Sequence, residues 1–134
     1  MINRFWWRGM DIQGQVAYWI KSSQEDFAAA ESLLQKNHRR HALFFAHLAV
    51  EKTLKAIVTQ RTGDVPPKTH NLIRLAQMAR LTLSDKQLDF LREFNLYQQE
   101  GRYPDAALPA IGRSVAAAEL RRAKEFSEWL RALS

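Results

Sequence analysis

The chain has 134 residues, of which 46% are hydrophobic and 25% charged, a composition typical of one ordinary globular domain. It has no cysteine, which excludes a disulfide framework and a zinc finger, and no window approaches the ~18 consecutive apolar residues of a membrane-spanning helix. The formal net charge of +6 permits nucleic acid or another acidic partner, although the basic residues are scattered and form no long run.

The first ten residues, MINRFWWRGM, show no helical period. They lack the sustained apolar region and the small-residue cleavage site of a signal peptide. We expect Phe5, Trp6 and Trp7 to pack on the rest of the chain or on a second subunit. The sequence therefore predicts an N-terminal extension over 1–10 and a single helical domain over 11–134, located in the cytoplasm.

Two long helices are predicted next. The first runs from about Ile12 to Lys36 and ends at Asn37, and the second runs from about His41 to Arg61 and ends at Gly63, which can adopt the left-handed cap conformation. The inner residues of the first helix alternate in steps of four and three along one seam. They are Val16, Ile20, Ser23, Phe27, Ala30 and Leu34, with Trp19 and Leu33 beside them.

The second helix contains the most apolar stretch of the chain, FFAHLAVEKTLKA from Phe44 to Ala56. A helix that is apolar on most sides is normally surrounded by partners, so we expect it at the centre of a bundle. His47, Glu51 and Lys55 are spaced four residues apart and share one side. They either form a site with a base, a carboxylate and a cation, or form an ion-paired polar seam against a partner subunit. We favour the seam, with Glu51 paired to Lys55.

Two shorter helices follow a loop that contains two prolines, Asp64–Lys68. Thr69 is the predicted N-cap of a helix over Leu72–Ala79. Ser84–Gln87 has the pattern of a capping box and predicts a helix over Asp85–Gln98. The inner residues of these two helices are predicted to be Leu72, Leu75, Ala76, Ala79, Leu88, Leu91, Phe94 and Asn95.

A loop over Glu100–Asp105 is predicted to end the fourth helix, and the last helix runs from Ile111 or Ser114 to Leu133. One side of the last helix is expected to face inward. Its residues are Val115, Ala116, Glu119, Leu120, Ala123, Phe126 and Leu130. No stretch alternates as a strand does. The predicted fold is an all-α, antiparallel, up-and-down bundle of about five helices.

Two further motifs are candidate binding sites. Lys68, His70 and Asn71 stand at the start of the third helix, where backbone N–H groups can receive a phosphate; the alternative is a plain capped helix with His70 packed on the second helix. Arg102 and Tyr103 can clasp a phosphate and stack on a base, or can simply anchor their loop. We expect no metal site and no cofactor.

Three segments in order and spacing resemble the HEPN domain family. They are Ala49–Ala56 (AVEKTLKA), Pro67–Leu72 (PKTHNL) and Gly101–Asp105 (GRYPD), and the resemblance extends from about Trp19 to Trp129. It implies a five-helix bundle like the C-terminal half of kanamycin nucleotidyltransferase, usually a homodimer. It also implies nucleotide or RNA binding, and a small nucleotidyltransferase as partner in a toxin–antitoxin-like pair.

Many members of this family resemble metal-independent ribonucleases that use an arginine followed, after four to six residues, by a histidine near the start of the last long helix. This chain departs from that pattern. Arg102 is in the right region, but Ala107–Pro109 occupy the places where histidine is expected, and no histidine follows Arg113. Arg40 and His47 have the spacing but lie at the start of the second helix. The chain most resembles the Arg-Tyr-Pro-Asp subgroup, for which no catalytic motif is apparent.

The sequence therefore favours a non-catalytic module that binds a nucleotide, RNA or a nucleotidyltransferase partner. Arg102 and Tyr103 are the first candidate ligand contacts, followed by Lys68, His70 and Asn71. The alternatives are a ribonuclease with a degenerate or atypical active site and a purely structural dimerisation module.

Overall fold

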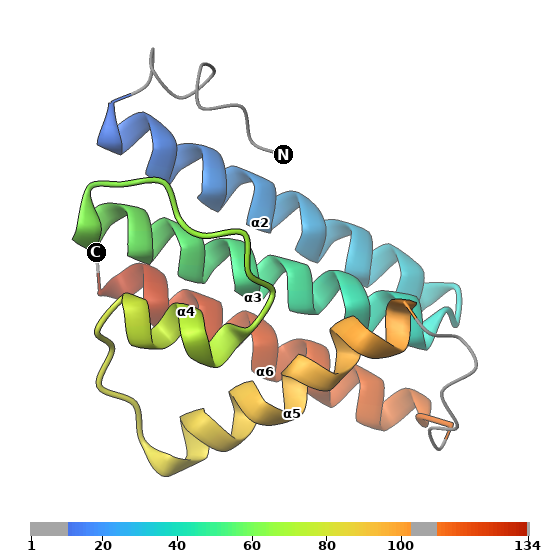
Figure 1. The fold of residues 1–134 in the computed structure, drawn as a ribbon. Helices are drawn as coiled ribbons and strands as arrows, with labels where there is room; N and C mark the ends of the chain where they lie inside the picture. Colours follow the sequence, from blue (N-terminus) through green and yellow to red (C-terminus); the bar gives the residue numbers. More distant parts are fainter. Residues whose placement is uncertain (1–10, 103–109, 134) are drawn as a thin grey trace.

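The computed structural model describes residues 11–102 and 110–133, and this part of the chain consists of five α-helices with no strand (Figure 1). The helices are α2 (Ile12–Gln35), α3 (Arg39–Thr62), α4 (Leu72–Met78), α5 (Asp85–Arg102) and α6 (Arg113–Ala132). The predicted all-α bundle is confirmed. Within the described ranges, no helix is both long enough and apolar enough to cross a membrane.

Helix α3 lies at the centre of the bundle, as predicted, and α2, α4, α5 and α6 all pack on it (Figure 1). Most of its residues between Ala42 and Thr59 are buried. Leu43, Val50 and Leu54 are fully covered and join the main core. Since each buried side chain of this size contributes about 1.5–3 kcal/mol, the apolar sides of α3 account for much of the stability of the bundle.

The first two helices form an antiparallel hairpin joined by small and polar contacts. The hydroxyl of Ser23 lies 2.7 Å from the carbonyl oxygen of Ala49 and 2.7 Å from the hydroxyl of Thr53. Lys52 pairs with Asp26 at 2.8 Å. Small side chains at this contact let the two backbones approach closely, so α2 is held along the length of α3.

The predicted ends of the first two helices are confirmed by their backbone geometry. Asn37 has φ 65° in the α2–α3 turn, and Gly63 has φ 71° after the last residue of α3. The N–H of Gly63 donates to the carbonyl oxygen of Thr59, which closes the last turn. The capping box of α5 is also present, because Ser84 N donates to Gln87 Oε1 at 2.9 Å and Gln87 N donates to Ser84 Oγ at 3.2 Å.

Three local predictions were wrong. The N-cap of α4 is Asn71, whose side chain accepts from two backbone N–H groups, while Thr69 accepts from the N–H of Asn71 in the preceding turn. Helix α5 continues through Gly101 to Arg102, because a single glycine weakens a helix without necessarily ending it. Val115 is 54% exposed, since its neighbour Ala116 takes the inward position on α6.

Candidate functional site

A buried carboxylate joins two of the predicted candidate groups. Lys55 Nζ donates to Glu51 Oε2 at 2.9 Å, and His70 Nδ1 lies 2.9 Å from Glu51 Oε1. The side chains of Glu51 and Lys55 are only 4% and 9% exposed, whereas that of His70 is 45% exposed. The cluster therefore runs from the interior of the bundle to its surface, and His70 is its exposed end.

The predicted Glu51–Lys55 ion pair is present, but it is covered by this chain's own residues. Helix α2 closes one side, where Lys55 Nζ lies 5.4 Å from the centre of the Trp19 ring. His47, Glu51 and Lys55 are all buried within the chain, so a partner subunit would not contact them directly. An ion pair removed from water is costly unless further contacts compensate, and here the indole and the imidazole supply them.

His47 lies beside this pair and is completely buried. Its Nδ1 is 3.9 Å from Glu51 Oε1. Burial lowers the pKa of His47 to about 4, with Glu51 opposing the shift and His70 adding to it. His47 is therefore neutral at pH 7, and Glu51 interacts with one neutral ring, one ammonium group and the exposed imidazole of His70.

Two asparagines fix the segment that carries His70. Asn71 Oδ1 accepts from the N–H groups of Ile73 and Arg74 at 3.0 and 3.3 Å. Asn95, on α5, accepts from the N–H of Leu72 at 2.9 Å and donates to Asn71 Oδ1 at 3.2 Å. The sequence predicted that Asn95 lies on the inner side of its helix but assigned it no role. A polar amide among apolar inner residues was the signal that could have indicated its hydrogen bonds to the start of α4.

These hydrogen bonds also change how a ligand can bind at Lys68, His70 and Asn71. The N–H groups of Leu72, Ile73 and Arg74 already have acceptors, so they are not available to a phosphate as the sequence had suggested. The side chains of Lys68 and His70 are exposed and remain candidates.

The backbone of Arg102 lies away from the segment that carries His70. Arg102 is the last residue of α5, about 10 Å along the helix from Asn95, which is the residue that meets Asn71. Figure 1 shows this end of α5 at the same end of the bundle as the α2–α3 turn. The side chain of Arg102 and all of Tyr103 lie outside the described residues, as does the rest of the predicted loop up to Asp105.

No three His, Asp or Glu side chains within 11–102 and 110–133 are placed to hold a metal ion. The chemistry that the cluster offers is that of an exposed imidazole oriented by a buried carboxylate. Such a pair can bind an anion when the imidazole is protonated, or can transfer a proton as a general acid or base.

The sequence matches the HEPN domain family over residues 16–133. Two solved structures have the same fold. One is TT1696 from Thermus thermophilus, with 21% identity, a TM-score of 0.76, and coverage of 88% of this chain and 97% of that one. The other is ST0689, described as an archaeal HEPN homologue, with 20% identity, a TM-score of 0.68, and coverage of 88% and 96%. No curated protein matches the sequence.

Replacing Glu51 should destabilise the fold through the charge that it leaves behind. Glu51→Gln keeps the shape but leaves the Lys55 ammonium buried without a counter-ion, and we expect it to lower the free energy of unfolding by about 3 kcal/mol. The double variant Glu51→Leu/Lys55→Met removes both charges and should cost about 1 kcal/mol or less. Urea unfolding measures both. Asp89→Asn, in an exposed ion pair, is the control and should change stability by less than about 0.5 kcal/mol. Equal losses in the single and double variants would contradict the buried-pair argument.

The folded protein should lose stability as the pH is lowered, because His47 is buried in its neutral form. Its folded pKa of about 4 is below the ordinary value of 6.5, so the unfolded chain binds the proton first. The contribution is fully present above pH 6.5 and is lost as the pH falls towards 4, by roughly 3 kcal/mol. Urea unfolding between pH 7.5 and 4 should show this slope in the wild type and a flatter one in His47→Gln. Parallel curves for the two proteins would exclude His47 as the source.

Proposed function

The chain belongs to the HEPN domain family, and we propose that it is a non-catalytic module that binds phosphate groups of a nucleotide or RNA at Lys68 and His70. The observation that carries the proposal is the 2.9 Å contact between buried Glu51 and exposed His70. This contact fixes the imidazole at the surface, two positions along the chain from the exposed Lys68. When the imidazole of His70 is protonated, it and Lys68 together present two cations to an anionic ligand.

The overall charge supports the same ligand class. The formal net charge of +6 attracts polyanions over distances of about 10 Å at moderate salt, before any specific contact forms. The Asn71–Asn95 hydrogen bonds hold the segment in place before binding, so little ordering entropy is lost when a phosphate arrives.

The proposal includes an assembly role, supported by the family resemblance alone. A homodimer and a small nucleotidyltransferase partner, in a toxin–antitoxin-like pair, are the assemblies that the resemblance implies. Because His47, Glu51 and Lys55 are buried within the chain, a dimer would use other surfaces. Co-purification with the product of a neighbouring nucleotidyltransferase gene, followed by sedimentation analysis, tests this role.

A second candidate function, RNA cleavage without a metal, is favoured by the same contact. An imidazole held by a buried carboxylate is the arrangement that orients histidine as a general base or acid in many enzymes. The pair is therefore also an atypical ribonuclease candidate, in place of the arginine–histidine motif that the sequence lacks.

Replacing Lys68 and His70 should weaken phosphate binding. We expect Lys68→Ala/His70→Gln to weaken binding of ATP, GTP or a short RNA by about 1.5–3 kcal/mol, the range for hydrogen bonds to charged groups. Calorimetry at low and high salt measures it. Lys86→Ala, at an exposed lysine on α5, is the matched control and should bind as the wild type does. Arg102→Ala tests whether the end of α5 takes part. No heat for any of these ligands with the wild type would end the proposal.

An RNA cleavage assay in EDTA separates the two candidates. Under the binding proposal, purified protein leaves labelled RNA intact, because the site only holds the phosphate. Cleavage that persists in EDTA, disappears in His70→Gln and remains in Lys86→Ala would replace the binding module with the ribonuclease. Cleavage that is insensitive to His70→Gln would be assigned to a contaminant.

A further inference from the structure

The first half of α2 carries an apolar groove that is open to solvent. It has a volume of about 370 Å³, and its described lining comes from α2 and from the last turn of α3. Lys21 is the one charged residue in that described lining, so burial of apolar surface rather than ion pairing would hold an occupant. The other residues that shape the groove are Ile12, Val16, Ala17, Ile20, Gln24 and Gln60.

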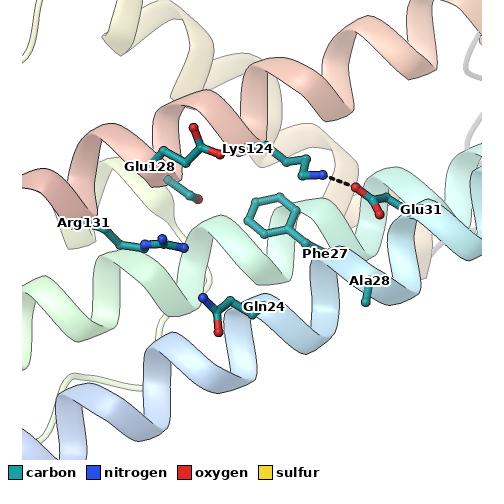
Figure 2. A pocket seen from close by; sticks show the side chains of 8 residues that line it. Gln24, Phe27, Ala28, Glu31, Lys124, Glu128 and Arg131 are labelled. Atoms are coloured by element: carbon teal, nitrogen blue, oxygen red, sulfur yellow. Dashed lines mark hydrogen bonds and ion pairs between the residues drawn. The ribbon is translucent and has the colours of Figure 1, made fainter.

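Further along α2, the same side of the helix is covered by α6. Lys124 of α6 pairs with Glu31 of α2, and Arg131, in the last turn of α6, lines a pocket together with Gln24 (Figure 2). Each step of seven residues on one helix matches a step of seven on the other, so the two helices are antiparallel. Gln24 also lines the groove, so the groove begins where α6 ends.

The floor of the groove is a small apolar cluster, separate from the main core. Trp19 and Ala56 are its buried residues, and the half-buried Val16 and Ile20 pack against them. The Trp19 ring in turn lies 5.4 Å from the ammonium group of Lys55. An occupant of the groove would therefore back the layer that shields the buried ion pair from solvent.

The ten residues before α2 have the composition of such an occupant. Residues 1–10 lie outside the described part of the chain, and their sequence, MINRFWWRGM, contains Phe5, Trp6 and Trp7 but no acidic residue. One buried aromatic side chain covers about 150–250 Å², so these three together present several hundred Å² of apolar surface. Soluble proteins rarely leave a continuous apolar patch of that size uncovered.

The length of this segment matches the position of the groove. Trp7 precedes Asp11, the N-cap of α2, by four residues, so an extended chain carries it at most about 14 Å from the start of the helix. Val16 and Ile20 lie about 8 and 14 Å along the helix from Asp11. Gly9, between Trp7 and the helix, has the backbone freedom that a reversal of the chain requires.

We propose that residues 1–10 turn back at Gly9 and dock along α2, with Trp6 and Trp7 packed in the groove against Val16 and Ile20. The docked segment extends the cover that α6 gives to the second half of α2. The lining of the groove includes neither Lys68 nor His70, so this inference and the proposed phosphate binding can fail separately.

Trypsin reports on this docking, because it cleaves after Arg8, next to the proposed anchors. Limited digestion of the full folded chain, followed by mass spectrometry, measures the rate at which residues 1–8 are removed. Ala17→Glu places a charge in the groove at an exposed position and should raise this rate at least roughly fivefold. The matched control is Ala28→Glu, at an exposed alanine later in α2 and outside the groove, which should leave the rate unchanged.

A second variant removes the anchors from the segment itself. Each rate is divided by that of a free peptide of residues 1–13 with the same sequence, which corrects for changes beside Arg8. Trp6→Ser/Trp7→Ser should then raise the rate as much as Ala17→Glu does, and combining the changes should add nothing, since both break one contact.

Three results would overturn the proposal. One is a wild-type rate equal to that of Ala17→Glu, and another is an additive effect of the combined changes. The third is protection that disappears on dilution to concentrations at which sedimentation shows single chains, because the groove would then bind the segment of a second copy.

Discussion

The arrangement of the bundle rests on how it compensates the buried carboxylate of Glu51. A charge taken out of water costs several kcal/mol unless opposite charges and hydrogen bonds replace the solvent. Lys55 supplies the charge, and His70 supplies the second contact. Lys55 in turn lies against Trp19 of α2. One ionised group therefore links α2, α3 and the segment before α4, three parts of the chain that apolar packing alone would hold with less precision.

The polar contacts around Glu51 and the apolar core stabilise different parts of the fold. The core residues of α3 hold the long helices together, and their contribution is largely non-directional. Helix α4 has only seven residues and is too short to be stable by itself. Its start is fixed by directional contacts instead, from Asn71 within the segment and from Asn95 on α5. The position of His70 at the surface follows from these hydrogen bonds and from Glu51.

Elements whose signals are local could be predicted from the order of the residues. The helical period, the capping box of Ser84 and Gln87, and the left-handed glycine at 63 depend on residues within a few positions of one another, and all three were predicted correctly. The spacing of four residues likewise predicted the Glu51–Lys55 pair. Local competition was harder to resolve: Thr69 and Asn71 can both cap a helix, and Gly101 could either end α5 or lie within it.

What surrounds the polar side of α3 could not be predicted in this way. Glu51 and His70 are 19 positions apart, and Asn71 and Asn95 are 24 apart, so no periodicity connects them. The pattern placed His47, Glu51 and Lys55 on one side of a helix without specifying whether solvent, a subunit or this chain covers that side. Burial is a property of the packed neighbours. It arose when α2, α5 and the segment before α4 closed over α3, and that closure turned a polar stripe into a buried ion pair that contacts the exposed His70.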